Sequence, residues 1–345
     1  MKQRLNGPDI IRVLAILFVM ATHSIAYLSP MGTAIHSLKW TVYVIIRFTA
    51  LSCVPLFIML TGYLNRKKTL TAAYFKGIIP VLISYAVISV FCILYAVYKG
   101  NTSYDISSAI RSILGFSANG YAWYVEMYIG LFLLIPFLNM LFDQLQTFRL
   151  RLLLCAILVF LTMLPTTLQS FRIDGTTLDM IPDYWESAYP IAYYYIGAMI
   201  AEYRPRMKKL YSVLLTALAI AVPSALCWFF SSVEGGYAWY MMNGFACITS
   251  GAVALTVFLL FYDVELPRPL GLVFREISVC TFEMYLFSDI VDRIIYKGPR
   301  YFMPAMVLTV FAVSYLCARI LRLLLVPLYK RIKVSRQKKR EVQTE

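Results

Sequence analysis

Long apolar runs alternate with short polar segments along most of the chain. The runs cover approximately residues 10–28, 41–63, 78–98, 121–141, 151–168, 187–202, 210–230, 240–262, 277–296 and 303–325. Most of them approach the length of about 20 residues with which a helix crosses the hydrocarbon core of a bilayer. The pattern predicts an all-α membrane protein, a polytopic bundle of about ten transmembrane helices with short loops. The mixed segment 104–117 predicts a short helix at the interface.

The first apolar run follows a basic start, Met1-Lys2-Gln3-Arg4, as it would in a signal peptide. However, Asp9 and Arg12 interrupt the beginning of the run, and its end lacks the small residues of a cleavage site. We therefore expect this run to be retained as the first span.

The composition agrees with a membrane protein. Hydrophobic residues make up 60% and charged residues 14% of the 345 residues, and the mean hydropathy is +0.70. Soluble domains carry roughly 25% charged residues, so the composition excludes a disordered protein, a soluble enzyme and a disulfide-rich secreted module. All seven cysteines lie in apolar runs without a CxxC pair, and the chain has only two histidines. We expect neither a metal site nor a disulfide framework.

The net charge of +14 would suggest nucleic-acid binding in a soluble protein. In a chain with ten spans, 21 of the basic residues fall on the side of the two termini and 6 on the opposite side. Because cytoplasmic loops collect Lys and Arg, we expect both termini in the cytoplasm and no nucleic-acid partner. The chain then divides into a transmembrane domain, 1–329, and a basic cytoplasmic tail, 330–345, that contacts anionic headgroups.

Ionisable residues inside spans are functional candidates, because their insertion into hydrocarbon is costly. They are Asp9, Arg12, His23, Arg47, Glu126, Glu283, Asp289, Asp292, Arg293, Arg319 and Arg322. Some have structural explanations. Asp289 and Arg293 are four residues apart and can pair on a helix; Asp292 lies near the outer end of its span, where water reaches it. Arg319 and Arg322 can snorkel to the inner interface.

Arg12 and His23 form the most specific pattern. They are eleven residues apart, close to three helical turns, so they share one helix face about 16 Å apart. Asp9, one turn earlier, can orient the guanidinium. Histidine exchanges a proton near neutral pH, and arginine offers a planar fork for phosphate or carboxylate.

This pair suits a donor with a phosphorylated head and a long thin arm that ends in an acyl carbon. Coenzyme A thioesters have that shape, and the basic cluster Arg66-Lys67-Lys68 is placed to receive the head. These three residues are equally explained as a positive flank on the cytoplasmic side.

The segment Asp9-Ile10-Ile11-Arg12, followed after ten residues by His23, resembles the opening signature of the acyltransferase-3 family of membrane O-acyltransferases. Other segments resemble the family's motifs in the same order: 54–64, 123–131, 134–136, 195–197 and 281–287. The chain departs from the family at Thr61, where serine is usual. It also has Ser288 and Asp289 where many members have a histidine, which leaves His23 to act alone.

The resemblance implies that the transmembrane domain moves an acyl group, usually acetyl, from acyl-CoA on the cytoplasmic side to a hydroxyl of an envelope carbohydrate or related molecule. No permanently bound cofactor is implied. His23 would be the general base or brief acyl carrier, Arg12 would bind the donor, and Asp9 would fix Arg12. Many larger members carry an additional extracytoplasmic SGNH-type domain, so this chain either completes the transfer itself or works with a separate partner.

The substrate-binding candidates that remain are Arg47, for an oxyanion or carboxylate, and Glu126 with Trp123 and Tyr124, for acceptor hydroxyls. Glu126 is equally explained as the buried partner of Arg47. Two other functions stay open. A transporter or flippase for a lipid-linked sugar or other anion would also place charges inside spans, although no internal repeat typical of transporters is visible. A scaffold without catalysis would leave these costly charges without a use.

Overall fold

The chain folds almost entirely into helices, and the computed structural model places a helix in each of the ten expected spans. It describes residues 6–28, 33–100, 104–173, 176–179, 181–297 and 302–341. The backbone forms two compact units. The first consists of Met1–Lys67, Asn139–Ser278 and Arg300–Val307, and the second of Lys68–Leu138, Val279–Pro299 and Leu308–Glu345.

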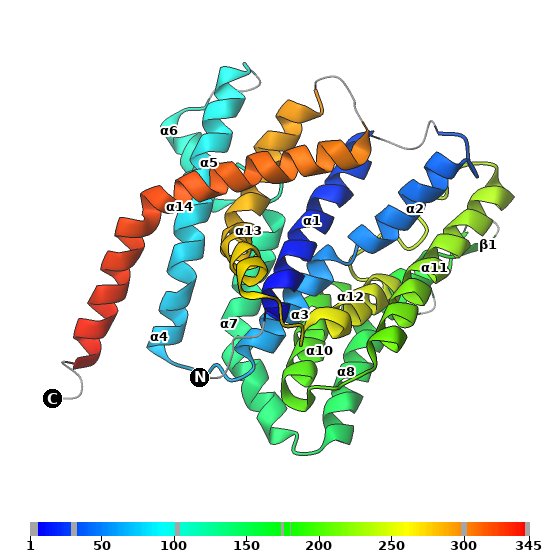
Figure 1. Cartoon of the computed structure of the whole chain (residues 1–345), viewed down its shortest axis with the longest axis horizontal. Coiled ribbons are helices and arrows are strands. Elements are labelled where there is room, and N and C mark those ends of the chain that lie inside the picture. Colours follow the sequence, from blue (N-terminus) through cyan, green and yellow to red (C-terminus); the bar gives the residue numbers. More distant parts are fainter. Residues whose placement is uncertain are drawn as a thin grey trace. The chain divides into compact units, whose positions relative to one another are not determined.

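Figure 1 labels most of the helices, coloured along the sequence. The first unit contains α1 (Gly7–Leu28), α2 (Leu38–Ala50), α3 (Cys53–Asn65), α8 (Phe148–Thr162), α9 (Leu164–Gln169), the 3₁₀ helix η3 (Glu186–Ala188), α10 (Tyr189–Tyr203), α11 (Lys209–Glu234) and α12 (Ile248–Phe261). The second contains α4 (Ala72–Phe75), the 3₁₀ helix η2 (Lys76–Ile78), α5 (Ile79–Tyr98) and α6 (Ile106–Leu114). Three helices contribute to both units: α7 (Trp123–Gln144), α13 (Arg268–Ile295) and α14 (Met303–Glu341).

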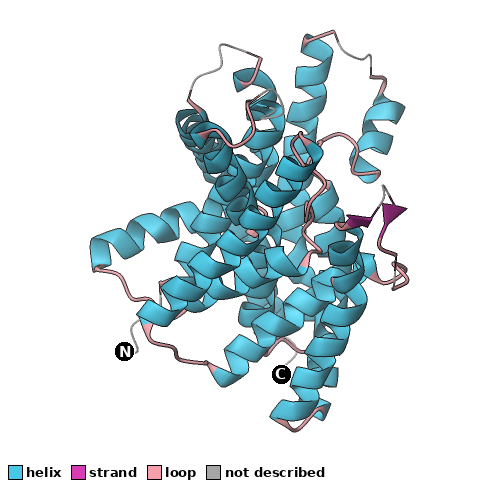
Figure 2. Ribbon diagram, turned by 90° about the vertical axis from the view of Figure 1, so that its right-hand side faces the viewer, coloured by secondary structure: helices cyan, strands magenta, loops and turns pink. Residues whose placement is uncertain are grey.

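Within the described residues, strands are limited to β1 (Arg172–Ile173) and β2 (Thr176–Thr177). They pair antiparallel, with Arg172 opposite Thr177, and form the small magenta hairpin in Figure 2. The hairpin lies in the loop between α9 and α10. The helix α6 occupies the segment for which a short interfacial helix was expected.

Two of the expected spans are interrupted by prolines. The second span divides into α2 and α3 at Leu51 and Ser52, four residues before Pro55. The fifth divides into α8 and α9 at Met163, just before Pro165. A proline has no N–H for the carbonyl four residues earlier, and its ring crowds that carbonyl. A nearby proline therefore explains each interruption, whereas Pro136 of α7 and Pro223 of α11 lie inside continuous helices.

The expected span 240–262 is wrong over its first eight residues, because α12 begins only at Ile248. The preceding helix α11 ends at Glu234, and Gly235 takes a positive φ of 65° that favours glycine. Gly236 and the Asn243-Gly244 pair follow in the same segment. These turn-forming residues keep the apolar segment 236–247 out of a helix.

Among the described residues, six helices are long and apolar enough to cross a membrane: α1, the pair α2–α3, the segment Ala72–Tyr98, α7, α11 and Met303–Leu325 of α14. Among the others, α12 is apolar but has 14 residues and α10 has 15. The helix α13 carries several charges in its second half. The chain is therefore a membrane protein with six candidate spans, and ten spans with cytoplasmic termini stay a prediction. The expected tail 330–345 begins as a continuation of α14, and residues 342–345 lie outside the described part.

In the first unit, two glycines bring α3 and α10 into close contact. A Cβ atom on Gly62 would lie 2.0 Å from the carbonyl oxygen of Tyr194, and one on Gly197 would lie 1.9 Å from that of Met59. Only glycine permits backbones to approach this closely, as in other membrane helix pairs. The contact fixes α10 beside α3 at the level of Met59 and Gly62.

A second cluster holds α2 against α11 and the loop that follows it. Its buried members are Trp40, Val44, Phe48, Leu51, Cys227, Ala238, Met241, Met242 and Cys247, with Phe171 and Tyr237 among the side chains packed around them. The cluster supplies a rigid base for the loop between α9 and α10.

Candidate active site

The start of α1 is anchored against the segment that joins α12 to α13. The side-chain oxygen of Asn6 accepts a hydrogen bond from the Leu266 N–H at 3.0 Å. A Cβ atom on Gly7 would lie 2.2 Å from the carbonyl oxygen of Tyr262. These contacts fix the height and rotation of α1, and with them the direction of Asp9 and Arg12.

Asp9 is buried, with 1% of its surface exposed. Its Oδ1 accepts a hydrogen bond of 2.8 Å from the hydroxyl of Ser278 on α13, itself buried. The same hydroxyl accepts a hydrogen bond of 3.3 Å from Nη1 of Arg12. Ser278 thus joins the carboxylate to the guanidinium, a link that sequence reasoning did not find. The spacing of Asp9 and Arg12 showed that they share a face, but nothing in the sequence placed α13 beside it.

The face of α1 between Arg12 and His23 points into the protein. Ile16, Val19 and Met20 occupy this stretch of the face, and their exposed fractions are 0%, 3% and 0%. Arg12 and His23 at its two ends are half-buried. Beside His23, the hydroxyl of Thr22 contacts the thiol of Cys53 at the start of α3. The face is therefore covered by other helices and is not presented to lipid.

Arg47, the candidate for oxyanion contact, is 3% exposed on α2. Its Nη1 donates to the Tyr237 hydroxyl at 3.2 Å, and its Nη2 donates to the carbonyl oxygens of Trp239 and, at 3.1 Å, Met241. Its guanidinium also lies 4.6 Å from the centre of the Trp239 ring. Arg47 therefore ties α2 to the loop before α12, and its burial is explained without a role in the reaction. The partner considered for it, Glu126, lies in the second unit.

Arg66, the first residue of the predicted donor cluster, is also engaged. It is 2% exposed and lies over the ring of Phe142, 4.2 Å from its centre. Its Nη2 lies 2.5 Å from Asp143 and 3.4 Å from Glu202. Glu202 further pairs with Arg151 at 3.5 Å. This network, which we call the Arg66 network, joins the ends of α3, α7, α8 and α10.

The expectation that Arg66, Lys67 and Lys68 receive the head of the donor stays a prediction. The buried Arg66 guanidinium faces carboxylates of its own chain. Lys67 has a side chain that is 77% exposed and reaches Glu202 at 3.2 Å, and Lys68 is exposed. The two lysines are the members of the cluster that remain accessible to a phosphorylated ligand.

The other substrate-binding candidates lie at the start of α7 in the second unit. Trp123 is 38% exposed and meets Tyr124 edge to face, with ring centres 6.0 Å apart. Tyr124 in turn packs against Tyr285 of α13 at 5.6 Å. Glu126 is exposed on the same helix. The aromatic pair is thus held by packing, and the carboxylate of Glu126 points outward from its own unit.

The charges of α13 in the second unit all have partners within that unit. Nε and Nη2 of Arg293 donate to the two oxygens of Asp289 at 2.9 and 3.0 Å, which confirms the pairing expected from their spacing. Arg322 does not snorkel alone, because its Nη1 lies 3.0 Å from Glu283. The expectation of a hydrated Asp292 is wrong, since this residue is fully buried and accepts a hydrogen bond of 2.7 Å from the Tyr121 hydroxyl.

Within the described residues, no group of three or more His, Cys, Asp and Glu side chains is placed to hold a metal ion. All seven cysteines are free, and six of them are buried. The chemistry of the α1 face is therefore that of an arginine held by a carboxylate through a hydroxyl, with a histidine three turns away. Such a face can bind an anionic group at one end and exchange a proton at the other.

A comparison with protein families identifies the family to which this protein belongs. The family model for an acyltransferase domain matches residues 5–323, nearly the whole chain. The chain belongs to the acyltransferase-3 family. Searches of curated proteins and of solved structures gave no match. Family membership confirms the resemblance seen in the motifs and makes the chain a membrane acyltransferase. The matched range includes α1, α3, α10 and the part of α13 that carries Ser278.

Proposed function

We propose that this acyltransferase moves an acyl group, acetyl in the first instance, from acyl-CoA on the cytoplasmic side to a hydroxyl of an envelope or exported carbohydrate. The observation that carries the proposal is the interior face of α1. On it, Arg12 is held by Ser278 and Asp9, and His23 follows three turns later on the same side.

Arg12 is the donor-binding residue in this proposal. Its guanidinium is oriented by a buried hydroxyl that is itself hydrogen-bonded to a carboxylate, so the fork is pre-organised before the donor arrives. A charged fork of this kind binds phosphate or polarises a thioester oxygen better than a lysine does. Lys67, which is exposed, would attract the phosphates of the nucleotide head at the membrane surface.

His23 is the residue that moves the proton. As the acceptor hydroxyl attacks the thioester carbon, the imidazole takes the hydroxyl proton and becomes imidazolium. The C–O bond forms, the C–S bond breaks, and the leaving thiolate takes the proton back. The products are an ester and free CoA, and His23 ends in the state in which it began. A variant of this route, in which the acyl group resides briefly on the imidazole, has the same balance.

The test is an assay with membrane vesicles that contain the full chain and acetyl-CoA labelled in its acetyl group. Label bound covalently to envelope carbohydrate, above that of vesicles without the protein, supports the proposal. Label that crosses the membrane without becoming covalently bound would instead support the transporter or flippase interpretation. Label released only as free acetate would show a thioester hydrolase and contradict the proposed acceptor class.

A further inference from the structure

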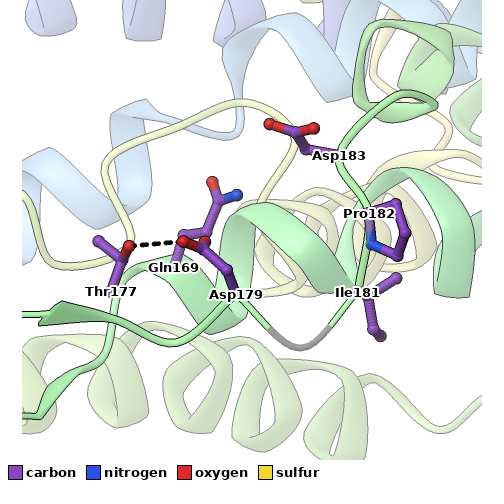
Figure 3. A pocket seen from close by; sticks show the side chains of 6 residues that line it. All are labelled: Gln169, Thr177, Asp179, Ile181, Pro182 and Asp183. Carbon is purple, nitrogen blue, oxygen red and sulfur yellow. Dashed lines mark hydrogen bonds between the residues drawn. The ribbon is translucent and has the colours of Figure 1, made fainter.

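The first unit contains a cavity that the proposed reaction does not yet use. It lies between the end of α9 and the loop that leads into α10, and its volume is about 650 Å³. Its lining residues are Gln169, Thr177, Asp179, Ile181, Pro182 and Asp183, drawn in Figure 3. We call it the α9 pocket. Its size falls within the range of about 300–1,000 Å³ that is typical of small-molecule sites.

The hydrogen-bonding groups of the α9 pocket suit a ligand with several hydroxyls. Two carboxylates, one amide and one hydroxyl face it, while Ile181 and Pro182 supply the apolar part of the wall. Thr177 donates to Asp179 at 2.9 Å, the dashed line in Figure 3. Acceptor-only carboxylates bind the O–H donors of a sugar, and an amide can both donate and accept. The two carboxylates disfavour an anionic ligand such as CoA.

Two large aromatic residues follow the pocket directly. Tyr184 is 89% exposed and Trp185 is 60% exposed. Aromatic rings with one apolar face and one polar edge are suited to sites that are half wet, and the apolar face of a sugar ring packs on them. The loop thus presents hydrogen-bonding groups and aromatic surface next to each other, the combination that a carbohydrate needs.

The loop is held in place from both ends. At its start, the hydroxyl of Thr167 accepts a hydrogen bond of 2.9 Å from the Ile248 N–H. Phe171 packs edge to face on Phe230, with ring centres 6.0 Å apart. At its end, the Glu186 N–H donates to the carbonyl oxygen of Asp183 at 2.9 Å. Both ends of the loop that lines the pocket are therefore fixed by contacts within the fold.

Polar groups of the same unit lead from the pocket toward α1. Glu186 follows Asp183 by one turn and lies near Tyr189 at the start of α10. The helix α10 that begins there packs closely on α3, and the thiol of Cys53 at the start of α3 contacts Thr22, the neighbour of His23 in the chain. The distribution of basic residues also predicts that the loop lies on the outer side, where an envelope acceptor is found.

We propose that the α9 pocket binds a sugar unit of the acceptor and so holds the carbohydrate on the outer side of His23. The part of this inference that concerns the acceptor rests on the proposed function. The binding of a carbohydrate in the pocket does not rest on the proposed function, because it is argued from the residues of the pocket and its loop.

A binding experiment on the purified full chain tests the inference without acetyl-CoA. The probe is the pool of oligosaccharides released from the host's envelope polysaccharide by mild acid and labelled fluorescently at the reducing end. Binding is followed by fluorescence anisotropy. The test variants are the double variant Asp179→Asn/Asp183→Asn and Trp185→Ala. The matched control is Glu265→Gln, an exposed carboxylate between α12 and α13.

We expect the native chain and Glu265→Gln to bind the pool equally. The double variant should raise Kd about tenfold or more, because each asparagine loses a charged acceptor. Trp185→Ala should raise Kd as well, whereas a Trp185 that only anchors the loop at the interface would leave binding unchanged. Absence of binding by the native chain, or a double variant that binds like the native chain, overturns the inference.

The two proposals fail in different ways. The variant His23→Gln should bind the oligosaccharide pool with the native Kd, because it leaves the pocket intact. If the double variant transfers acetyl groups to carbohydrate with an unchanged acceptor KM, the pocket assignment is wrong and the proposed function stands. If the pool binds in the α9 pocket but no acetyl transfer occurs, the pocket assignment stands and the proposed function is wrong.

Discussion

The hydroxyl of Ser278 donates a hydrogen bond of 2.8 Å to the carboxylate of Asp9, 269 positions earlier in the chain. Because the same hydroxyl accepts from Arg12, the contact fixes the guanidinium through a residue on another helix. The relation links the start of α1 to the first half of α13. It also explains why an aspartate can be buried so close to the end of a membrane helix.

Ser278→Ala should weaken donor binding more than it slows transfer. The variant removes the link between Asp9 and Arg12, so we expect the KM for acetyl-CoA to rise several-fold while kcat changes less. Loss of a buried hydrogen bond should also cost about 1–2 kcal/mol of stability. Kinetics with labelled acetyl-CoA measure the first effect and thermal unfolding in detergent the second.

The matched control for that variant is Ser212→Ala on α11. The Ser212 hydroxyl is buried and has no hydrogen-bond partner among the described residues, so its removal should change neither KM nor Tm appreciably. Equal KM values for Ser278→Ala and Ser212→Ala would show that Ser278 has no role in donor binding.

Arg66→Ala should destabilise the protein, whereas Lys67→Ala should act on the donor alone. Arg66 is buried between Asp143 and Glu202, and its loss leaves Glu202 with fewer partners. We expect Arg66→Ala to lower the free energy of unfolding by on the order of 2–3 kcal/mol. This is less than for a fully buried ion pair, because Asp143 is 60% exposed. Lys67 should contribute less than about 1 kcal/mol to stability. A comparison of Tm values decides this, and equal values would contradict the structural role of the Arg66 network.

Gly197→Ala should disrupt the packing of α3 against α10. The added methyl group would meet the backbone of Met59 at 1.9 Å, and the helices have to separate to accept it. We expect a loss of about 3 kcal/mol or failure to fold, the upper end of the cost of overpacking. Gly130→Ala on α7, where no atom lies within 4 Å of the added carbon, should fold normally. Size-exclusion profiles and Tm in detergent compare the two.

The orientation of the chain can be tested by cysteine labelling. Since six native cysteines are buried and the seventh is partly buried, background labelling by a membrane-impermeant maleimide should be low. The variant Arg340→Cys should be protected in intact cells and labelled after permeabilisation, while Ser187→Cys should be labelled from outside. Labelling of position 340 in intact cells would contradict the predicted cytoplasmic C-terminus.

The sequence predicted the helices well because hydrophobic runs dominate it. It also predicted the Asp289–Arg293 pair, since that contact is local and set by helix geometry. The same reasoning located the face of Arg12 and His23 but not Ser278, because the partner comes from a helix that is distant in sequence. The interruptions near Pro55 and Pro165 were not predicted, because the apolar runs continue through both prolines and a proline does not always break a helix.

The contacts of several charged residues could not be predicted from the sequence. Arg66 was interpreted as a contact for the donor head or as a flanking charge, and Arg322 as a snorkelling charge. Both are paired with carboxylates from other helices. Arg47 was interpreted as a substrate contact, a role that stays a prediction. Its hydrogen bonds go to main-chain carbonyls of a loop 190 or more positions away. In each case the decisive partner depends on tertiary packing, which periodicity does not encode.

The central claim is that His23 exchanges the proton in acyl transfer, and one comparison tests it most directly. Native chain, Arg12→Lys and His23→Gln are reconstituted in vesicles with labelled acetyl-CoA and envelope carbohydrate. Arg12→Lys should raise the KM for acetyl-CoA, because an ammonium cannot reproduce the fork. His23→Gln should bind acetyl-CoA as the native chain does but transfer the acetyl group about 10²–10⁴-fold more slowly. Transfer by His23→Gln at close to the native rate would contradict the account.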